Sequence, residues 1–367
     1  ARTPCVACIG VTPAGVVYAG VDRIGSLGKG SGKGRIIRLT DANHDGVHDS
    51  HSVFAVLDNP RGILPFGDKV YVLHTEWSGE KTFVGMHLSV LTDANADGKA
   101  DGPPRYLVKD ISTRKSNEQR GADHTTNGIR MGIDGWIYVA VGDYGFVDAT
   151  GSDGTKLTMY GGGIVRVRPD GSELETYTHG MRNIYDVAID PYLNLFTFGN
   201  TNDGGGWNVR FNHHVQTGEY GYPTLFKRYT SEIIPALVDL GGGSGTGSMF
   251  FDEPGWPAAF TAVPMMCDWG RGQLFIHRVT EDGPSFTQEQ EAFINCRHIT
   301  DVDCDASGRL FIGSWGTSGF SGGSDGFVAR VVPKGWTYKE FPALKGLNDA
   351  DLSDLLTSAS TKARQHA

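Results

Sequence analysis

The sequence predicts an all-β protein, a six-bladed β-propeller with a short C-terminal helix. Glycine accounts for 52 of 367 residues and is spread between short apolar runs, which indicates many tight turns. The runs alternate in Val, Ile, Tyr and Phe with the period of two that is typical of strands. One pattern, an apolar residue followed by a Gly or Asp turn and a β-rich run, recurs six times along the chain.

The six copies of this pattern define six units of unequal length. In chain order they are "TPAGVVYAG" (12–20), "PFGDKVYVLH" (65–74), "GIDGWIYVAVGD" (132–143), "IDPYLNLFTFG" (189–199), "DWGRGQLFIHRV" (268–279) and "DASGRLFIGSWG" (305–316). Six four-stranded units favour a propeller, because radial repetition leaves only short sheet edges exposed. We expect residues 1–343 to form it, closed by pairing of the N-terminal strand with the last blade. A double-sheet sandwich is the alternative architecture.

Residues 344–367 are predicted to be a separate helical segment. The stretch "NDADLSDLLTSASTKARQHA" (348–367) begins with an N-cap-like Asn-Asp and then places Leu352, Leu355 and Leu356 at helical spacing. We expect one amphipathic helix, which either docks on the propeller or begins a further domain.

Composition excludes some classes of function. The formal net charge of -9 argues against a nucleic-acid partner, since binding a phosphate backbone needs a basic face. No apolar run approaches the roughly 18 residues that a membrane-spanning helix requires. The five cysteines are interpreted as structural or disulfide-bonded, because Cys5 and Cys8 lack the second close pair of a zinc site.

Two Asp-rich loops, "DANHDGVHDS" (41–50) and "DANADGKADG" (93–102), have the spacing of a cation site. Oxygen-bearing residues stand at positions 1, 3, 5 and 9 of each loop, with glycine at position 6. These residues are Asp41, Asn43, Asp45 and Asp49, then Asp93, Asn95, Asp97 and Asp101. Ca²⁺ prefers several oxygen ligands and a glycine that allows the sharp turn. An Asx-rich hairpin turn without metal is the alternative.

A histidine next to an aspartate precedes the third repeat copy. Because Asp123-His124 lies just before a predicted strand, His124 is expected near one face of the propeller. Histidine titrates near neutral pH, which suits the abstraction of a proton from a substrate. An ordinary solvated loop residue is the alternative.

Two segments resemble the soluble quinoprotein aldose dehydrogenases, the PQQ-dependent glucose/sorbosone dehydrogenase family. One is the segment 179–223, with its Arg182-Asn183 pair and its "YGYP" (220–223). The other is Asp123-His124 with the strand that follows. The "DxNxDGxxD" turns, "GGIVRVRPDGSELE" and "HHVQTGEYGYP" are similar to a PVC-type "membrane-bound dehydrogenase" β-propeller domain.

The resemblance implies a secreted or periplasmic sugar dehydrogenase that oxidises an aldose or a related hydroxyl. It implies that His124 is the general base, that Arg182 polarises the quinone or substrate oxygen, and that Asn183 fixes pyrroloquinoline quinone (PQQ). It further implies a Ca²⁺ ion around Thr201, Asn202 and Asp203, and a c-type haem domain downstream in the full-length protein. Asp123, Arg271 and Arg297 are the remaining candidates for cofactor binding.

The sequence departs from the family where PQQ carboxylates are held. Gly270-Arg271-Gly272 stands in place of a Lys-Arg-Gly, and His298-Ile299-Thr300 in place of an Arg-x-Arg. Two other functions therefore stay open, since propellers host many activities. One is a metal-assisted carbohydrate lyase or hydrolase that uses His124, His213, His214 and Arg182. The other is a carbohydrate- or partner-binding propeller without catalysis.

Overall fold

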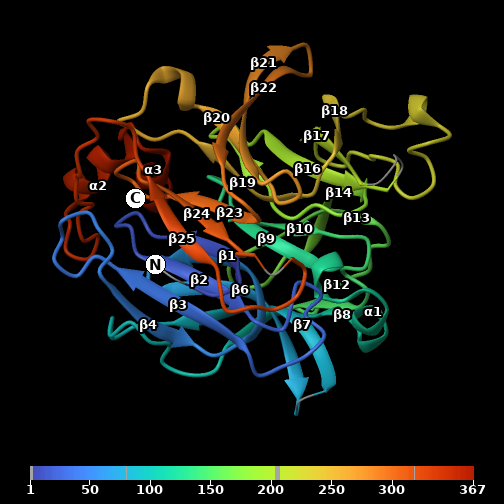
Figure 1. Cartoon of the computed structure of the whole chain (residues 1–367), viewed down its shortest axis with the longest axis horizontal. Helices are drawn as coiled ribbons and strands as arrows, with labels where there is room; N and C mark the ends of the chain where they lie inside the picture. Colours follow the sequence, from blue (N-terminus) through green and yellow to red (C-terminus); the bar gives the residue numbers. More distant parts are fainter. Residues whose placement is uncertain (1–2, 80, 203–206, 318) are drawn as a thin grey trace.

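Six β-sheets surround a central axis in the computed structural model, which describes residues 3–79, 81–202, 207–317 and 319–367 (Figure 1). Strands within each sheet are antiparallel and mostly follow chain order, the arrangement of propeller blades. The six-bladed all-β fold predicted from the sequence is confirmed.

Blades 1 to 3 come from the first half of the chain. Blade 1 consists of β1 (Val6–Val11), β2 (Val17–Asp22), β3 (Gly34–Thr40) and β4 (Ser50–Ala55). Blade 2 consists of β5 (Asp58–Phe66), β6 (Lys69–Ser78), β7 (Thr82–Thr92) and β8 (Arg105–Ser112). Blade 3 consists of β9 (Thr126–Met131), β10 (Ile137–Val141), β13 (Gly162–Val167) and β14 (Glu175–Met181). The connection between β10 and β13 contains β11 (Ala149–Gly151) and β12 (Lys156–Leu157), which join the sheet of blade 2.

Blades 4 to 6 complete the ring. Blade 4 consists of β15 (Ala188–Ile189), β16 (Leu195–Thr201), β17 (Asn208–His214) and β18 (Val238–Gly242). Blade 5 consists of β19 (Gly245–Phe251), β20 (Val263–Asp268), β21 (Gln273–Asp282) and β22 (Ser285–Asn295). The described strands of blade 6 are β23 (Ile299–Cys304), β24 (Leu310–Ser314) and β25 (Phe327–Val331). Short 3-10 turns lie at η1 (Ala122–His124), η2 (Thr230–Glu232) and η3 (Ala258–Phe260).

The predicted closure by a shared sheet is wrong. β1 is the first strand of blade 1, and β23 to β25 pair only with one another. The ring closes instead through loop contacts, in which the Thr3 N–H donates to the Gly326 carbonyl over 3.2 Å. The Cys5 N–H likewise donates to the Asp325 carbonyl over 3.0 Å.

Alternating strand direction gives the propeller two distinct faces. The first strands of all blades begin at one face, which we call the upper face, and end at the lower face. Near their beginnings, Arg61, Tyr185 and Thr300 line a cavity of 50 Å³. Near their ends, Met131 and Cys304 line a cavity of 340 Å³.

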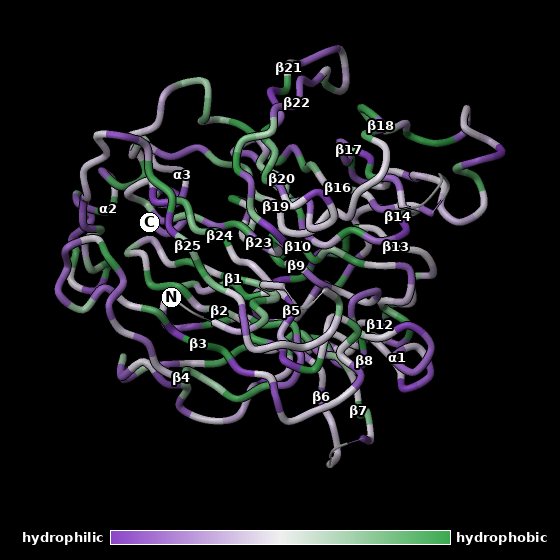
Figure 2. The backbone as a smooth tube through the Cα atoms, viewed as in Figure 1, coloured by the Kyte–Doolittle hydropathy of each residue, from purple (hydrophilic) through white to green (hydrophobic). Residues whose placement is uncertain are grey.

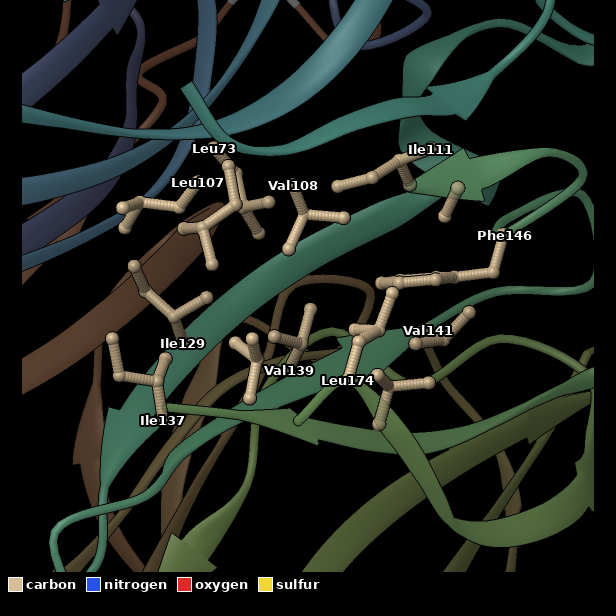
Figure 3. Close-up of a cluster of buried hydrophobic side chains, with 14 of the residues drawn as sticks. Leu73, Leu107, Val108, Ile111, Ile129, Ile137, Val139, Val141, Phe146 and Leu174 are labelled. Carbon is tan, nitrogen blue, oxygen red and sulfur yellow. The ribbon is translucent and has the colours of Figure 1, made fainter. Parts of the chain in front are cut away.

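Apolar side chains between neighbouring blades form the core. Leu107 and Val108 of blade 2 face Ile129 and Val139 of blade 3, and all four are buried (Figure 3). Burying one such side chain contributes about 1.5–3 kcal/mol, so these contacts hold successive blades together. Hydrophilic residues gather at the periphery, for example at the tip of the β21–β22 hairpin (Figure 2).

A buried ionic cluster fills the channel between the two faces. The Arg130 guanidinium donates to Asp186 over 2.6 Å and lies 3.3 Å from Asp301 and 3.4 Å from Asp303. The three carboxylates also accept backbone N–H groups from β1 and β19. Burial raises the pKa of Asp186, and it raises the pKa of Asp301 to about 8 although Arg130 opposes this shift.

All five cysteines are buried free thiols. The structural interpretation is therefore confirmed, whereas no disulfide forms. Burial raises the pKa of the Cys8, Cys267 and Cys304 thiols, which keeps them protonated and unreactive. Within the described residues, no helix combines the length and apolarity needed to cross a membrane.

The C-terminal segment forms two short helices, not the single helix predicted. They are α2 (Asp349–Leu356) and α3 (Thr361–His366). The chain leaves helical geometry after Leu356, and the Ser360 side chain then caps α3 by accepting from the Ala363 N–H. A second N-cap serine inside the segment explains the break.

Helix α3 docks on the lower face. Lys362 Nζ lies 3.2 Å from Asp303 Oδ1, and the Lys362 N–H donates to Glu253 Oε1 over 2.8 Å. The His366 ring stacks on Phe66, with their centroids 4.4 Å apart. α3 therefore lies across the lower end of the channel.

We expect the free energy of unfolding to fall as pH rises from about 4 to 8, in part because of Glu253. This carboxyl is buried, and its Oε2 has no hydrogen-bond partner among the described residues. Burial raises its pKa to about 8, so the folded state binds the proton more tightly than the unfolded chain does. The stabilisation is then complete below the unfolded pKa of about 4.3 and is lost as pH rises through 8. Chemical denaturation at several pH values measures this slope.

Glu253→Gln should flatten the slope by up to ~1.4 kcal/mol per pH unit, the value for one proton. Part of the slope will remain because Asp301 is also raised. Glu232→Gln, at the exposed turn η2, is the matched control and should leave the slope unchanged. Equal slopes for Glu253→Gln and the wild-type protein would contradict the assignment.

Candidate active site

The predicted histidine lies on the upper face, where a short helix meets the start of blade 3. α1 (Arg114–Arg120) begins at the Thr113 N-cap and ends at Gly121, and η1 follows with His124 as its last residue. Gly121 has φ +89°, and a Cβ there would lie 2.3 Å from the Leu27 carbonyl oxygen. Glycine is therefore required for the sharp turn that presents His124.

The His124 ring is fixed from both sides. Its Nδ1 lies 2.6 Å from Asp143 Oδ1, and its Nε2 lies 2.8 Å from Arg120 Nη2. A guanidinium can only donate, so Nε2 is the acceptor and the ring proton sits on Nδ1, where it donates to Asp143. His124 is therefore a neutral imidazole oriented by a carboxylate, with 6% of its surface exposed.

Arg182 belongs to the same group of side chains. It follows β14, and its Nη1 lies 3.4 Å from the Asn200 carbonyl and 3.3 Å from Asn200 Oδ1. The Tyr222 hydroxyl interacts with both Arg182 and Asp143, while burial raises the pKa of Tyr222. The structure thus connects His124 to Arg182 through Asp143 and Tyr222.

Two further arginines, Arg61 and Arg120, lie close to this group, and sequence reasoning missed both. With Arg182 and Asp123 they act electrostatically on Tyr185, whose pKa burial raises. Arg61 donates to Asp22 over 3.0 Å, but its Nε has no partner among the described residues. Residues 114–120 lack the apolar periodicity of an amphipathic helix, so no pattern in the sequence pointed to Arg120.

Asp123 and Asn183 support the site from beneath its surface. The Asp123 carbonyl accepts from Asn127 Nδ2 over 3.1 Å and from Asn183 Nδ2 over 3.2 Å. All three residues are buried, and Oδ1 of each lacks a partner among the described residues. Burial raises the pKa of Asp123. These residues hold the η1 turn against blade 4.

The two cofactor-binding candidates from blades 5 and 6 have local backbone contacts. Arg271 donates to the carbonyls of Leu240 and Gly242, the latter over 2.8 Å, and so holds the neighbouring loop. Arg297 is exposed in the connection between β22 and β23, where its carbonyl accepts from Ser314. Their predicted role in cofactor binding stays a prediction.

The predicted calcium ligands next to Arg182 are only partly described. Thr201 lines a cavity of 250 Å³ together with Arg182 and Arg210, Asn202 is exposed, and Asp203 lies outside the described residues. Arg210 donates to the Thr201 hydroxyl. A cation at Thr201 would therefore face two guanidinium groups. Across the described ranges, no group of three or more His, Cys, Asp or Glu residues is arranged to hold a metal.

The two Asp-rich loops lie on the lower face, away from His124. Each connects the third and fourth strands of its blade, β3 to β4 and β7 to β8. In the first loop, Asp41 accepts from the N–H groups of Asp45 and Gly46, and Asp49 accepts from that of Ala42. The second loop repeats this pattern, with Asp93 accepting from Gly98. The acidic oxygens therefore face the inside of each turn.

If Ca²⁺ replaces the backbone N–H groups that these oxygens accept, a calcium chelator should lower the melting temperature by a few degrees. Asp45→Ala and Asp97→Ala should each reduce that response. Asp282→Ala, at the exposed β21–β22 hairpin, is the control. Thermal melts in EGTA and in excess Ca²⁺ provide the measurement, and an unchanged melting temperature would leave both loops as Asx turns.

The histidines named for a lyase or hydrolase lie elsewhere. His213 and His214 are buried in β17, and both ring nitrogens of His214 contact threonine hydroxyls, at 3.1 and 2.7 Å. Burial lowers the pKa of His214 to about 3. Neither histidine joins His124, so the structure contradicts that predicted constellation.

Aromatic rings cover the upper end of the axis. Trp269 stacks on His298 and on Phe320, with centroid distances of 4.2 and 4.7 Å. Trp207 contacts Phe320 edge-on at 6.3 Å. Phe320 is 52% exposed and Trp207 is 45% exposed, so both can contact a ligand.

Comparisons with known proteins agree with this fold. A family model described as "Domain of unknown function (DUF7133)" matches residues 22–293. Among curated proteins, none matches the sequence.

Three solved structures have similar propellers. A putative oxidoreductase (glucose dehydrogenase) from Thermus thermophilus is 17% identical, with a TM-score of 0.66 over 89% of this chain and 96% of that one. The PQQ-bound aldose sugar dehydrogenase from Streptomyces coelicolor is 18% identical, with a TM-score of 0.64 over 89% and 93%. The pyranose dehydrogenase PQQ domain from Coprinopsis cinerea is 13% identical, with a TM-score of 0.55 over 89% and 92%. The predicted resemblance to soluble glucose and aldose dehydrogenases is confirmed for the fold.

Proposed function

Because the chain belongs to the DUF7133 family, whose description names no activity, we propose its function from its own site: a quinoprotein-type dehydrogenase that oxidises an aldose or related hydroxyl. The observation that carries the proposal is the His124–Asp143 pair, with its 2.6 Å contact, next to Arg182 on the upper face. A half-buried carboxylate behind a neutral imidazole is the arrangement of a general base.

Each side chain of the group has a distinct part in this chemistry. His124 Nε2 takes the proton of the substrate hydroxyl, and Asp143 stabilises the imidazolium that results. Arg182 and Tyr222 donate hydrogen bonds to the substrate oxygen and hold its carbon in position. A bound quinone would supply the acceptor for the hydrogen and electron pair that leave this carbon.

The donor chemistry of the upper face fits an acidic quinone such as PQQ. Arg61, Arg120 and Arg182 supply charged donors for carboxylates, and the buried Arg61 Nε has no partner among the described residues. These arginines replace the unmatched family residues of blades 5 and 6. The central cavity of 50 Å³ is well below the roughly 300 Å³ of small-ligand sites. Binding therefore requires the exposed Phe320 ring to move aside.

The remaining parts of the proposal rest on the family resemblance. They are a carbohydrate substrate, a secreted or periplasmic location, and a c-type haem domain as electron acceptor. The described residues around Thr201 do not fit the Ca²⁺ ion of the resemblance, because Arg182 and Arg210 line the same cavity. The division into a propeller at 1–343 and a helical segment at 344–367 is likewise proposed. Docking of α3 on the lower face supports an association of the two parts.

Reconstitution tests the function directly. Purified protein is loaded with PQQ, with and without Ca²⁺, and reduction of an artificial dye is followed with a panel of aldoses. Sugar-dependent dye reduction that requires PQQ is expected. Demonstrated PQQ binding without dye reduction for any sugar would reject a dehydrogenase.

A further inference from the structure

We infer that a carboxylate-bearing ligand binds between Arg120 and Arg182 and thereby releases His124 Nε2 to act as the base. The carboxylate belongs either to an acidic sugar, such as a uronic acid, or to the cofactor. The inference rests on the proposed function only for the role of His124.

Arg120 is held by a weak partner. Its Nη2 donates to the neutral ring of His124 over 2.8 Å, and no carboxylate lies within 4 Å of it among the described residues. Guanidinium–carboxylate bonds are roughly twice as strong as neutral ones. A ligand carboxylate will therefore compete successfully with the imidazole for Arg120.

Arg182 also lacks a carboxylate partner among the described residues. Its described partners are neutral: the Tyr222 hydroxyl, and the Asn200 oxygens at 3.3 and 3.4 Å, which is longer than the usual 2.9–3.0 Å. Asp123 and Asp143 lie nearby, yet neither comes within 4 Å of either guanidinium in the described structure. Arg61 differs, because it already pairs with Asp22 over 3.0 Å. Two guanidiniums without a carboxylate partner therefore belong to the group around the base: Arg120 contacts His124 directly, and Arg182 is linked to it through Tyr222 and Asp143.

This arrangement has a direct consequence for the base. While Arg120 donates to Nε2, the lone pair that must take the substrate proton is occupied. A neutral ligand has nothing to draw Arg120 away, whereas a carboxylate does. The site thus favours an acidic ligand over a neutral one.

Binding to cofactor-free protein tests the inference without turnover. Calorimetry compares D-glucuronate, D-glucose and PQQ alone, while ¹⁵N NMR follows the His124 Nε2 resonance. Glucuronate or PQQ should move this resonance, whereas glucose should not. We expect glucuronate to bind at least about tenfold more tightly than glucose, a difference of ~1.4 kcal/mol.

Variants identify the residue that senses the carboxylate. Arg120→Met should weaken glucuronate binding by about tenfold and leave glucose binding unchanged. In this variant without ligand, the His124 Nε2 resonance should already lie where a carboxylate ligand moves it in the wild-type protein. Arg114→Met, at the exposed start of the same helix, is the matched control and should behave as wild type.

Competition distinguishes the two sources of carboxylate. If PQQ moves the resonance and blocks glucuronate, the carboxylate belongs to the cofactor; if both bind together, it belongs to the sugar. Failure of both acids to move the resonance, or unchanged acid binding in Arg120→Met, overturns the inference. Dye reduction by the PQQ-loaded protein, with a His124 resonance that neither glucuronate nor PQQ moves, would overturn it and leave the proposed function standing. If a carboxylate moves the His124 resonance but no sugar reduces the dye, the inference stands and the proposed function is rejected.

Discussion

Replacing His124 with alanine is expected to lower the turnover of the PQQ-loaded protein by about 10²–10⁴-fold, the usual contribution of a general base. The side chain makes polar contacts with Asp143 and Arg120 and belongs to no apolar core cluster. The fold should therefore survive the change. Steady-state dye reduction, together with a thermal melt of the same sample, measures both effects.

Three further variants sharpen this test. His124→Asn keeps some hydrogen bonding but should not restore the rate, because an amide cannot accept the proton. Asp143→Asn should lower turnover less than His124→Ala, since it removes only the group that orients the ring. His51→Ala, at an exposed position of β4, is the matched control and should be silent. A loss below about threefold in His124→Ala would show that another group takes the proton.

Arg130→Met is expected to cause the largest loss of stability, roughly 3–5 kcal/mol in the free energy of unfolding. The change leaves Asp186, Asp301 and Asp303 buried without the guanidinium that compensates them. Chemical denaturation measures the loss. The loss should be smaller at pH 5 than at pH 8, because protonated aspartates need no cation.

Two comparisons isolate the ionic cluster as the cause. Adding Asp186→Asn to Arg130→Met should recover part of the stability, because the carboxylate that contacts Arg130 over 2.6 Å is then removed together with its partner. Arg278→Met breaks an exposed pair with Glu291 and should cost at most about 1 kcal/mol. If Arg130→Met lowers the free energy of unfolding no more than Arg278→Met does, the buried aspartates of the channel do not depend on Arg130.

The propeller was predictable because local signals repeat. Five of the six copies span the turn between the first and second strands of a blade. The copy at 268–279 spans the turn between β20 and β21, one strand later. There Trp269–Gly272 forms a Gly-rich turn before a β-rich run, whereas the first connection of blade 5 contains η3 instead. Local pattern alone cannot show which turn of a blade it belongs to.

The candidate site was predictable only where a motif carried it. His124 and Arg182 stood in recognisable segments, and the structure brings them into one group. Arg61 and Arg120 reach the same place from blades whose local sequence gives no sign of a site. Arg271 stood in a suggestive Gly-Arg-Gly, yet its side chain turns to the backbone of the neighbouring loop. Side-chain direction is set by tertiary contacts, which sequence spacing does not record.

The ionic cluster and α3 close the lower end of the channel, so the channel opens at the upper face. Two cations, Arg130 and Lys362, face three aspartates, and Asp301 retains its proton at neutral pH because burial raises its pKa to about 8. The floor of the channel therefore pairs its cations with aspartates. A molecule that enters the channel at the upper face must leave through the same opening. In the proposed reaction, substrate entry and product release would therefore share this one opening.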